Sequence, residues 1–265
     1  MSNGTSPGTT ETENFFRGSV AMISIFAADL DGTLLGNPES EWRFHSAWAA
    51  LREKERPLLV YNTGRDLRDV RSLISEGVLP EPDAIIGGVG TLLEDARDPR
   101  ASTEFSRRFG EGWNLAVVEE IVGAFPRVVQ QPPSAQHPYK SSWRLADATP
   151  GELDALRGYL REAGVLANVV YSCDRYLDVL PDRADKGKAL AWYAERRGIP
   201  IAEILVAGDT GNDTSMFLLP EVVRLVVENA LPELLAEIVR LPKYFARGFF
   251  ADGVLDGLEH YGVIS

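Results

Sequence analysis

The 265-residue chain is poor in the side chains that build disulfides and nitrogen- or sulfur-ligated metal sites, with one cysteine and three histidines. The single cysteine, Cys173, excludes an internal disulfide, and the lack of a paired-cysteine pattern is typical of proteins from a reducing compartment. The histidines His45, His137 and His260 form no cluster with one another or with the cysteine along the sequence. We therefore expect them at the surface or in packing contacts.

Long apolar runs and clusters of basic residues are also missing from the sequence. No segment has the ~20 apolar residues that a membrane span needs. Aspartate and glutamate number 39 against 27 lysines and arginines, so the net charge of -12 should repel nucleic acid and anionic membranes. Residues 1–20 are rich in Ser, Thr, Gly and Glu and predict a mobile tail. The apolar run at 20–28 is short and leads into "DLDG" rather than a cleavage site, so we expect a cytoplasmic protein.

The order of the apolar segments predicts the fold class. A content of 45% hydrophobic and 25% charged residues is that of an ordinary globular protein. Short apolar runs that fit buried parallel strands alternate with helical patterns, which is the rhythm of a doubly wound, Rossmann-like α/β sheet. The predicted strands cover residues 21–29, 57–63, 83–88, 203–209 and 222–227, and the predicted helices cover residues 42–55, 66–76, 186–197 and 231–239.

The middle of the chain has a different rhythm. Between residues 97 and 181, two successive helix–strand–strand units (αββαββ) predict a small antiparallel sheet with helices on one face. We therefore expect an α+β module at 97–181, inserted into a core made of residues 21–96 and 182–265. Its helices are expected at 111–125 and 151–163, and its strands at 127–131, 140–146, 167–173 and 176–180.

The stretch "FAADLDGTLLGN" (26–37) drives an apolar segment into two aspartates separated by one leucine. In an extended strand the side-chain period is two, so Asp29 and Asp31 are expected on the same face. At ~4 Å such a pair repels by roughly 4 kcal/mol at an effective dielectric near 20. A fold tolerates that cost mainly where a cation relieves it, so the pattern predicts a cation site.

Four segments carry the chemistry: "DLDGT" (29–33), "NTGR" (62–65), "DKGKAL" (185–190) and "GDTGND" (208–213). Each alone fits a turn or a helix cap. Three of them close predicted strands, however, and ligands bind beyond the carboxyl ends of the strands in such sheets. We therefore expect the four segments to meet in one crevice.

The residue types in this crevice point to phosphoryl transfer. Asp29 is expected to attack phosphorus as a nucleophile, and Asp31 to act as general acid and then as general base. Gly32 and Thr33 allow backbone amides to approach the phosphate. Thr63 offers a hydroxyl donor, and Lys186 compensates the charge that shifts during transfer.

So many carboxylates around a phosphate require a divalent cation, and oxygen ligands suit Mg²⁺. We expect Asp29, Asp31 and Asp209 to bind the metal. Asn212 and Asp213 are expected to hold the metal's waters or Lys186 from outside the ligand shell.

With these residues in hand, the chain resembles the haloacid dehalogenase superfamily of Mg²⁺-dependent phosphatases over roughly residues 22–262. The four segments match the four motifs of that superfamily in order and spacing. The resemblance implies that the inserted α+β module is a cap of the kind found in the branch of Cof-type and sucrose-phosphate phosphatases. It also implies a sugar phosphate as the substrate and an aspartyl-phosphate intermediate.

Within that branch the chain is most similar to sucrose-phosphate phosphatases, on "VYNTGRDL" (60–67), "GGVGTLL" (87–93), "AQHPYKSSWRL" (135–145), "VVYSCDRYLDVLPDRADKGKAL" (169–190) and "ENALPEL" (228–234). The similarity favours sucrose 6-phosphate or a related disaccharide phosphate. It implies that Thr63, Gly64 and Arg65 contact the phosphate or neighbouring hydroxyls, and that three cap residues contact the sugar, namely Gln131, Tyr139 and Lys140.

Other functions remain open at this point. A phosphatase of another sugar or glycosyl-glycerate phosphate would use the same residues. A phosphomutase would share the aspartyl-phosphate but release no free phosphate. A signalling receiver domain is about half this length and has no inserted module, and a regulatory or binding domain would be expected to lack the nucleophile, whereas Asp29 is present. The oligomeric state cannot be read from the sequence.

Overall fold

The computed structural model describes residues 22–265, and their centre is a seven-stranded sheet. Residues 1–21, with the predicted tail and the start of the first predicted strand, lie outside the described residues. The strand order is β11-β10-β9-β1-β2-β3-β4, and all neighbours pair in parallel except β3 and β4. The bounds are β1 Ile25–Ala28, β2 Leu58–Asn62, β3 Ala84–Gly87, β4 Leu92–Asp95, β9 Ile204–Gly208, β10 Val223–Val226 and β11 Tyr244–Phe245.

Strand β1 lies where the strand order reverses. From β1 the chain moves outward through β2 and β3, and after the small sheet it returns to β9 on the other side of β1. Ala28 therefore pairs with Tyr61 on one side and with Ala207 on the other. In open α/β sheets this switch point is the usual ligand site, because the loops that follow the two central strands separate there.

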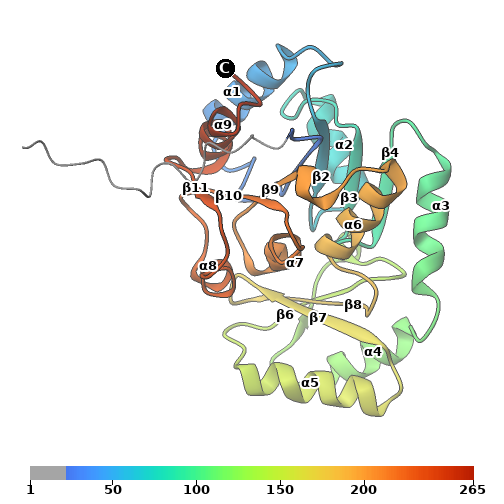
Figure 1. Cartoon of the computed structure of the whole chain (residues 1–265). Coiled ribbons are helices and arrows are strands. Elements are labelled where there is room, and N and C mark those ends of the chain that lie inside the picture. Colours follow the sequence, from blue (N-terminus) through green and yellow to red (C-terminus); the bar gives the residue numbers. More distant parts are fainter. Residues whose placement is uncertain (1–21) are drawn as a thin grey trace, which may run out of the picture.

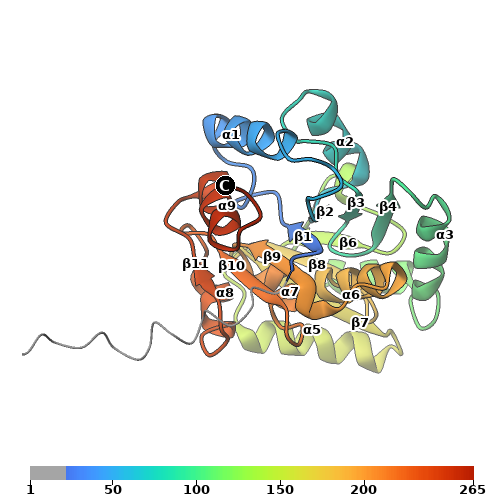
Figure 2. The same ribbon diagram turned by 45° about the horizontal axis from the view of Figure 1, so that its top comes forward.

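Helices cover both faces of the large sheet (Figure 2). One face packs against α1 (Pro38–Ala49), α2 (Leu67–Ser75) and α9 (Phe250–His260). The other face packs against α3 (Arg100–Ser106), α6 (Lys186–Arg197), α7 (Thr214–Phe217) and α8 (Pro232–Glu237). The strands are short and buried on both faces, which explains their continuous apolar sequences.

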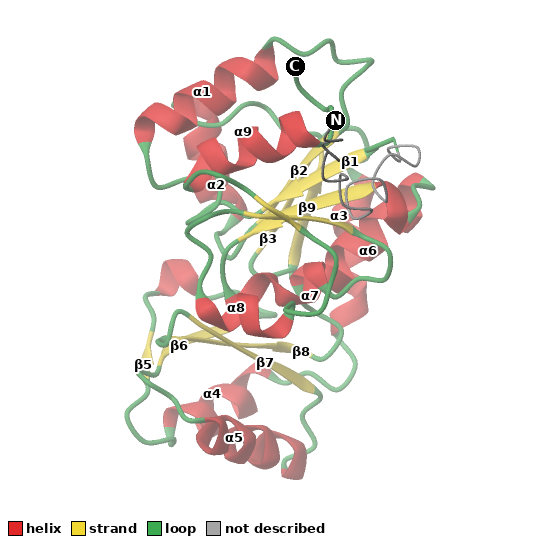
Figure 3. Ribbon diagram, turned by 60° about the vertical axis from the view of Figure 1, so that its left-hand side comes forward, coloured by secondary structure: helices red, strands yellow, loops and turns green. Residues whose placement is uncertain are grey.

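A second, four-stranded sheet lies below the large sheet in Figure 1. Its order is β5-β6-β8-β7 and all its pairings are antiparallel, with β5 Val129–Gln130, β6 Ser141–Arg144, β7 Ala167–Ser172 and β8 Tyr176–Pro181. Helices α4 (Leu115–Gly123) and α5 (Pro150–Glu162) cover the face turned away from the large sheet (Figure 3). We call residues 112–181 the cap.

The sides of β8 differ in chemistry, as expected for a half-covered sheet. Leu177 and Val179 pack with α4 and α5 in a separate apolar cluster. Asp178, between them in sequence, points the other way and lines a cavity between the cap and the large sheet. Alternation with period two thus gives the cap an apolar back and a polar front.

The predicted fold class, a doubly wound α/β core with an inserted α+β unit, is confirmed. Helix α6 has the predicted bounds, because Asp185 caps its first turn and Gly198 (φ 67°) ends it. Helices α3 and α9 and strands β4 and β11 were not predicted. The two strands are short edge elements, and tertiary pairing rather than a long sequence pattern determines them.

The start of the inserted unit also differs from the prediction. Residues 97–109 were expected to belong to it, but Ala101, Phe105 and Phe109 pack in the apolar cluster of the large sheet together with Leu190 of α6. Helix α3 therefore belongs with the core in its packing. Among residues 22–265, no helix is both long enough and apolar enough to cross a lipid bilayer.

Candidate active site

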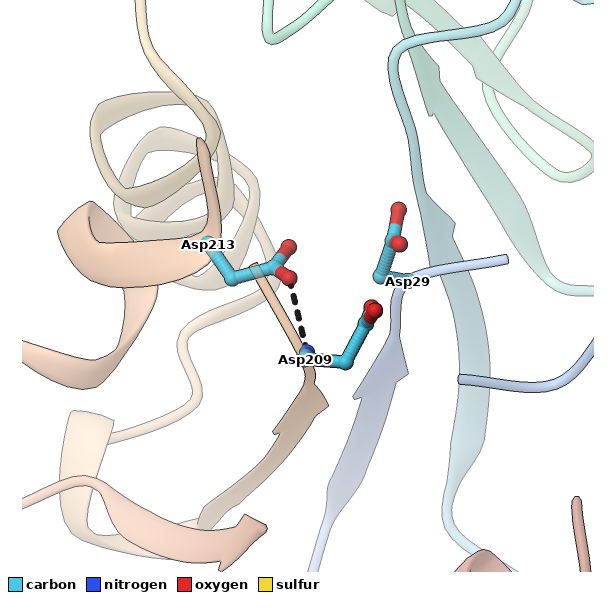
Figure 4. A group of neighbouring side chains, drawn as sticks. All are labelled: Asp29, Asp209 and Asp213. Carbon is cyan, nitrogen blue, oxygen red and sulfur yellow. Dashed lines mark hydrogen bonds between the residues drawn. The ribbon is translucent and has the colours of Figure 1, made fainter. Parts of the chain in front are cut away.

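Three aspartates meet beyond the carboxyl ends of β1 and β9. Asp29 follows β1, Asp209 follows β9, and Asp213 ends the short 3-10 turn Gly211–Asp213. One carboxylate oxygen from each lies within 4.8 Å of the others, and all three residues are buried (Figure 4). The site therefore brings together three acids from two segments that lie some 180 residues apart in the sequence.

The lysine of the third motif lies directly against this cluster. Lys186 is fully buried, and its Nζ donates to Asp29 Oδ1 and to Asp213 Oδ1, each at 2.6 Å. The Asp185 side chain accepts the Lys188 N–H and so fixes the start of α6. The Asn62 amide at the end of β2 donates to the Lys186 carbonyl at 2.9 Å, which ties the helix start to the sheet.

Asp213 is held from two sides. Its Oδ2 accepts the backbone N–H groups of Asp209 and Thr210, each at 3.0 Å, while its Oδ1 accepts Lys186. Asp213 therefore orients both the lysine and the loop that carries Asp209. Asn212 lines the cavity, and its Oδ1 is buried without a hydrogen-bond partner among the described residues.

The electrostatics of the cluster are unbalanced, because three carboxylates face one ammonium. Burial, and then the charge of Asp213, raises the pKa of Asp29 from 3.8 to about 7, although Lys186 acts in the opposite direction. Burial and the charges of Asp29 and Asp213 raise the pKa of Asp209 to about 8. Burial acts to lower the pKa of Lys186, but Asp213 and Asp29 outweigh it and the pKa is raised.

The turn after β1 brings the backbone close to Asp209. Gly32 has φ +88°, and a Cβ at this position would lie 2.1 Å from Asp209 Oδ2. Only glycine fits such an approach. The neighbouring Thr33 hydroxyl donates to Asp209 Oδ1 at 2.9 Å, so the first motif also positions the carboxylate of the fourth.

Asp31 lies differently from the sequence prediction. Strand β1 ends at Ala28, and the chain then turns, so Asp29 and Asp31 do not follow the alternation of a strand. The side chain of Asp31 is 58% exposed and is not part of the three-acid cluster. Instead, Arg65 donates to both its oxygens, from Nε at 2.7 Å and from Nη2 at 2.5 Å. Both side-chain oxygens of Asp31 are therefore occupied by Arg65, and its part in metal binding stays a prediction.

The second motif closes another side of the site. Thr63 is fully buried after β2, and its Oγ1 accepts the Arg65 N–H at 3.2 Å, which leaves its own hydrogen free to donate. Gly64 and Arg65 line the cavity. The loop after β3 supports them from behind, because Val89 donates its N–H to the Thr63 carbonyl and Gly88 donates to the Arg65 carbonyl.

The cavity between core and cap has a volume of about 470 Å³, and its floor includes Asp29 and Asp31. On the cap side, Gln131 and Lys140 line it, and their contact with the sugar stays a prediction. Lys140 Nζ lies 3.7 Å from Asp178 Oδ1, and that oxygen also accepts the Ser142 hydroxyl at 2.5 Å. These groups form a buried polar wall opposite the aspartate cluster.

Tyr139, the third predicted sugar contact, does not line the cavity. Its ring packs 5.4 Å from that of Phe109, with the apolar cluster of the large sheet. The neighbouring His137 does line the cavity, although it was expected at the surface or in packing contacts. Burial lowers its pKa, which favours the neutral ring. The sequence contains one signal for this position, namely that His137 lies close to Lys140 in "AQHPYK". In the structure a β-bridge between these two residues closes the loop.

The acid cluster fits a divalent cation. Its donors are all oxygens, which suit Mg²⁺. The raised pKa values of Asp29 and Asp209 show that their negative charges are costly here unless a cation offsets them. The unpartnered Oδ1 of Asn212 is a further buried oxygen, from a residue that lines the same cavity as Asp29. The aspartates therefore have the chemistry of a magnesium site, with Lys186 as a fixed internal cation.

Known proteins match the chain over most of its length. The family model for sucrose-6F-phosphate phosphohydrolase matches residues 22–262. A mannosylfructose-phosphate phosphatase from Agrobacterium fabrum is 40% identical over 242 residues, which are 91% of this chain and 98% of that protein. Sucrose-phosphatase 1 from Nicotiana tabacum is 30% identical over 258 residues, 92% of this chain but 60% of the tobacco protein.

A solved structure shows the same architecture. The sucrose-phosphatase from a Synechocystis species, in complex with sucrose and phosphate, superposes with a TM-score of 0.82 at 27% identity, and the match covers 91% of this chain and 98% of that one. The protein is thus a sugar phosphatase, a phosphoric monoester hydrolase of the haloacid dehalogenase superfamily. Because the family match covers nearly all of the described residues, the chain belongs to the sucrose-6F-phosphate phosphohydrolase family.

Proposed function

We propose that the protein is a Mg²⁺-dependent phosphatase that hydrolyses the phosphate monoester of a hexosyl-fructose disaccharide, such as sucrose 6-phosphate, through an aspartyl-phosphate on Asp29. The observation that carries the proposal is the contact of the buried Lys186 with Asp213 and with Asp29, which lines a polar cavity between the core and the cap. A nucleophile, a fixed cation and a set of oxygen ligands lie within a few ångströms of one another there.

Asp29 and Asp209 would hold the metal ion, with Asn212 and Asp213 beside it. When bound, Mg²⁺ supplies positive charge that lets an anionic carboxylate approach an anionic phosphate. The remaining positive charge comes from the chain itself. Lys186 is rigidly placed by two short hydrogen bonds, and Thr63 presents a hydroxyl donor, so both can stabilise the oxygens of the transferring phosphoryl group.

In the first step an Asp29 oxygen attacks phosphorus, and the bond between phosphorus and the sugar oxygen breaks. The leaving sugar oxygen takes a proton from the Asp31 carboxyl group. In the second step Asp31, now a carboxylate, removes a proton from water, and the resulting hydroxide attacks phosphorus. The Asp29–phosphorus bond breaks, inorganic phosphate leaves, and Asp31 is protonated again for the next cycle.

Arg65 has to change partners during this cycle. In the structure it donates to both oxygens of Asp31. Proton donation by Asp31 requires that this pair loosen. Arg65 lines the cavity, so incoming phosphate or sugar oxygens can take over its donors when the substrate arrives.

The cap provides the contacts for the sugar. The cavity is in the size range of small-molecule sites, and its cap wall offers amide, ammonium, imidazole and carboxylate groups from Gln131, Lys140, His137 and Asp178. Sugar hydroxyls can donate to the carboxylate and accept from the lysine. A buried site built for hydroxyl groups discriminates strongly against substrates that lack them.

A second substrate is favoured by one observation. The relative with 40% identity over nearly its whole length is a mannosylfructose-phosphate phosphatase, whereas the sucrose-phosphatases of tobacco and Synechocystis are 30% and 27% identical. We therefore propose mannosylfructose phosphate as the alternative substrate of the same site.

The test is release of inorganic phosphate from a panel of substrates at equal concentration with Mg²⁺. The panel contains sucrose 6-phosphate, mannosylfructose phosphate, trehalose 6-phosphate, glucose 6-phosphate and fructose 6-phosphate. We expect kcat/KM for one of the first two to exceed that for the hexose phosphates at least about tenfold. Preference for a hexose phosphate, or conversion of a substrate without phosphate release, would contradict the proposal.

A further inference from the structure

Glu233 connects the cap to the loop that carries the acids. It lies near the start of α8 and is half-buried. Its Oε1 accepts the backbone N–H of Gly211 at 2.7 Å and the backbone N–H of Cys173 at 3.1 Å. Gly211 belongs to the loop between Asp209 and Asp213, whereas Cys173 lies at the tip of the β7–β8 hairpin of the cap. One oxygen atom therefore links the loop of the acids to the tip of the cap hairpin.

This contact is distinctive in its position. Every other hydrogen bond that the structure records between the cap and the rest of residues 22–265 involves residues 182–184, where the chain leaves the cap. Strands β7 and β8 are paired from Ala167–Pro181 at that end to Ser172–Tyr176 at the tip. At ~3.3 Å per residue, the tip lies roughly 17 Å along the ribbon from the linker. Hydrogen bonds to the core thus hold the hairpin at both of its ends.

The core side of the contact is anchored to the catalytic machinery. The Leu231 N–H donates to the Asp209 carbonyl at 2.7 Å, which fixes the start of α8 to the end of β9. A Cβ at Gly211 would lie 3.0 Å from Glu233 Oε1 and 3.2 Å from the Tyr171 carbonyl. The loop, α8 and the hairpin therefore approach one another closely at this point, and α8 lies next to the small sheet in Figures 1 and 3.

The cap side of the contact is a tight turn. Cys173 and Asp174 both adopt left-handed conformations, with φ of 54° and 50°, which are uncommon for residues other than glycine. The turn leaves the Cys173 N–H outside the strand ladder, and Glu233 accepts it. The Cys173 side chain and Ser172 line the active-site cavity, so this turn forms part of the cavity wall.

We propose that Glu233 is a positioning residue, a latch that holds the cap hairpin closed over the substrate by accepting Cys173 N–H while it is anchored to the loop of Asp209. The inference rests on the proposed phosphatase function, and it adds the residue that sets the closed position of the cap. A carboxylate is suited to this role, because hydrogen bonds to a charged acceptor are stronger than those to a neutral one. When the latch opens, the hairpin swings about residues 182–184 and the cavity wall moves away from the substrate.

The first test measures cap opening without any substrate. Cys173 is the single cysteine of the chain, so its alkylation by iodoacetamide reports exposure of the hairpin tip. Burial, and then the charge of Glu233, raises the pKa of its thiol to about 11, so loss of the charge alone would speed the reaction. The matched comparison is therefore Glu233→Ala against Glu233→Gln, because both lose the charge and only glutamine keeps an acceptor. We expect alkylation of the Glu233→Ala variant to be at least about fivefold faster than that of the Glu233→Gln variant.

Equal alkylation rates for these two variants would overturn the latch. Glu233→Asp serves as a second variant, because it keeps the charge but is one methylene too short to span both N–H groups. It should react faster than the wild type although the charge is unchanged. Glu237→Ala, at an exposed position on the same helix, is the control and should react like the wild type.

The second test separates the latch from the chemistry. For the preferred disaccharide phosphate, Glu233→Ala and Glu233→Asp should raise KM at least about tenfold. Glu233→Gln should have a KM much closer to that of the wild type. For p-nitrophenyl phosphate, which is too small to need the cap wall, the loss should be clearly smaller. Equal losses on both substrates would show that Glu233 supports the Asp209 loop rather than the cap. If the wild type hydrolyses neither substrate, the proposed function fails, while the alkylation result still decides the latch.

Discussion

Lys186, fully buried in the first turn of α6, holds its ammonium 2.6 Å from the carboxylate of Asp29, 157 residues away in the sequence. The same nitrogen contacts Asp213 at the same distance. This contact places a nucleophile beside a permanent positive charge before any ligand arrives. It also leaves two negative charges in excess in the cluster of Asp29, Asp209 and Asp213, which is the physical reason for expecting a divalent cation.

Replacing the nucleophile should abolish turnover and preserve the fold. Asp29→Asn keeps the size of the side chain but removes the attacking oxygen anion, so we expect phosphate release to fall at least about a thousandfold. Unfolding should be unaffected or shifted to higher temperature in metal-free buffer, because a buried charge in a cluster of like charges is removed. Phosphate release and the melting temperature check the two parts. Substantial residual hydrolysis would rule out Asp29 as the nucleophile.

Loss of the buried lysine should affect both stability and activity. Lys186→Met leaves Asp29 and Asp213 buried without their partner, and breaking a buried ion pair costs roughly 3–5 kcal/mol. Urea unfolding in the presence of EDTA measures this cost, and phosphate release should be lost as well. Lys54→Met, at an exposed position, is the control and should change neither. A Lys186→Met variant as stable as the wild type would contradict the electrostatic account of the site.

Metal-free protein should lose stability as the pH rises. The pKa values of Asp29 and Asp209 are raised to about 7 and about 8, so the folded state retains protons that the unfolded state releases near pH 3.8. Since the folded state then binds more protons, stability falls with increasing pH across this window, by up to about 1.4 kcal/mol per pH unit for each group. The stability that these two groups contribute by holding their protons is complete below pH 3.8 and is lost as the pH passes 7–8.

The measurement is the free energy of unfolding in EDTA between pH 5 and 8.5, with and without excess Mg²⁺ (on the order of 10 mM). We expect Mg²⁺ to stabilise the protein most at the alkaline end, where both carboxylates are ionised. Asp29→Asn should show a shallower decline in EDTA. A stabilisation by Mg²⁺ that is independent of pH would argue against Asp29 and Asp209 as its ligands.

Two adjacent cap residues should behave in opposite ways. Lys140 lines the cavity, so Lys140→Met should raise KM for the disaccharide phosphate about tenfold or more and have a smaller effect on p-nitrophenyl phosphate. Tyr139 packs against Phe109 instead, so Tyr139→Phe, which keeps the ring, should leave both KM values within about twofold of the wild type. A large effect of Tyr139→Phe on the sugar substrate alone would show that its hydroxyl reaches the cavity after all.

Much of the core could be predicted because its signals are local. The apolar runs before Asp29, Thr63 and Asp209 are buried strands, and parallel strands bring their carboxyl ends to the same edge of a sheet. Asp185 is the N-cap of α6, so it indicates where the helix begins and where Lys186 lies. Residues far apart in sequence could therefore be grouped before their distances were known.

The cap contacts could not be predicted in the same way. Tyr139, Lys140 and His137 are neighbours in a loop, and which of them faces the cavity depends on the path of that loop over the sheet. The pairing of Asp31 with Arg65 depends on the turn that follows β1, because the strand alternation ends at Ala28. No short-range pattern encodes either outcome.

The sequence by itself determined the fold class, the order of the four motifs and the excess of acid at the ends of two strands, because strand burial, helix capping and charge are properties of short segments. Only the tertiary structure decided that Lys186 contacts Asp29 and Asp213, that Arg65 holds Asp31, and that Glu233 joins the cap to the loop of Asp209. Those contacts depend on how the sheets and helices pack across long sequence separations, and packing geometry is a property of the whole chain.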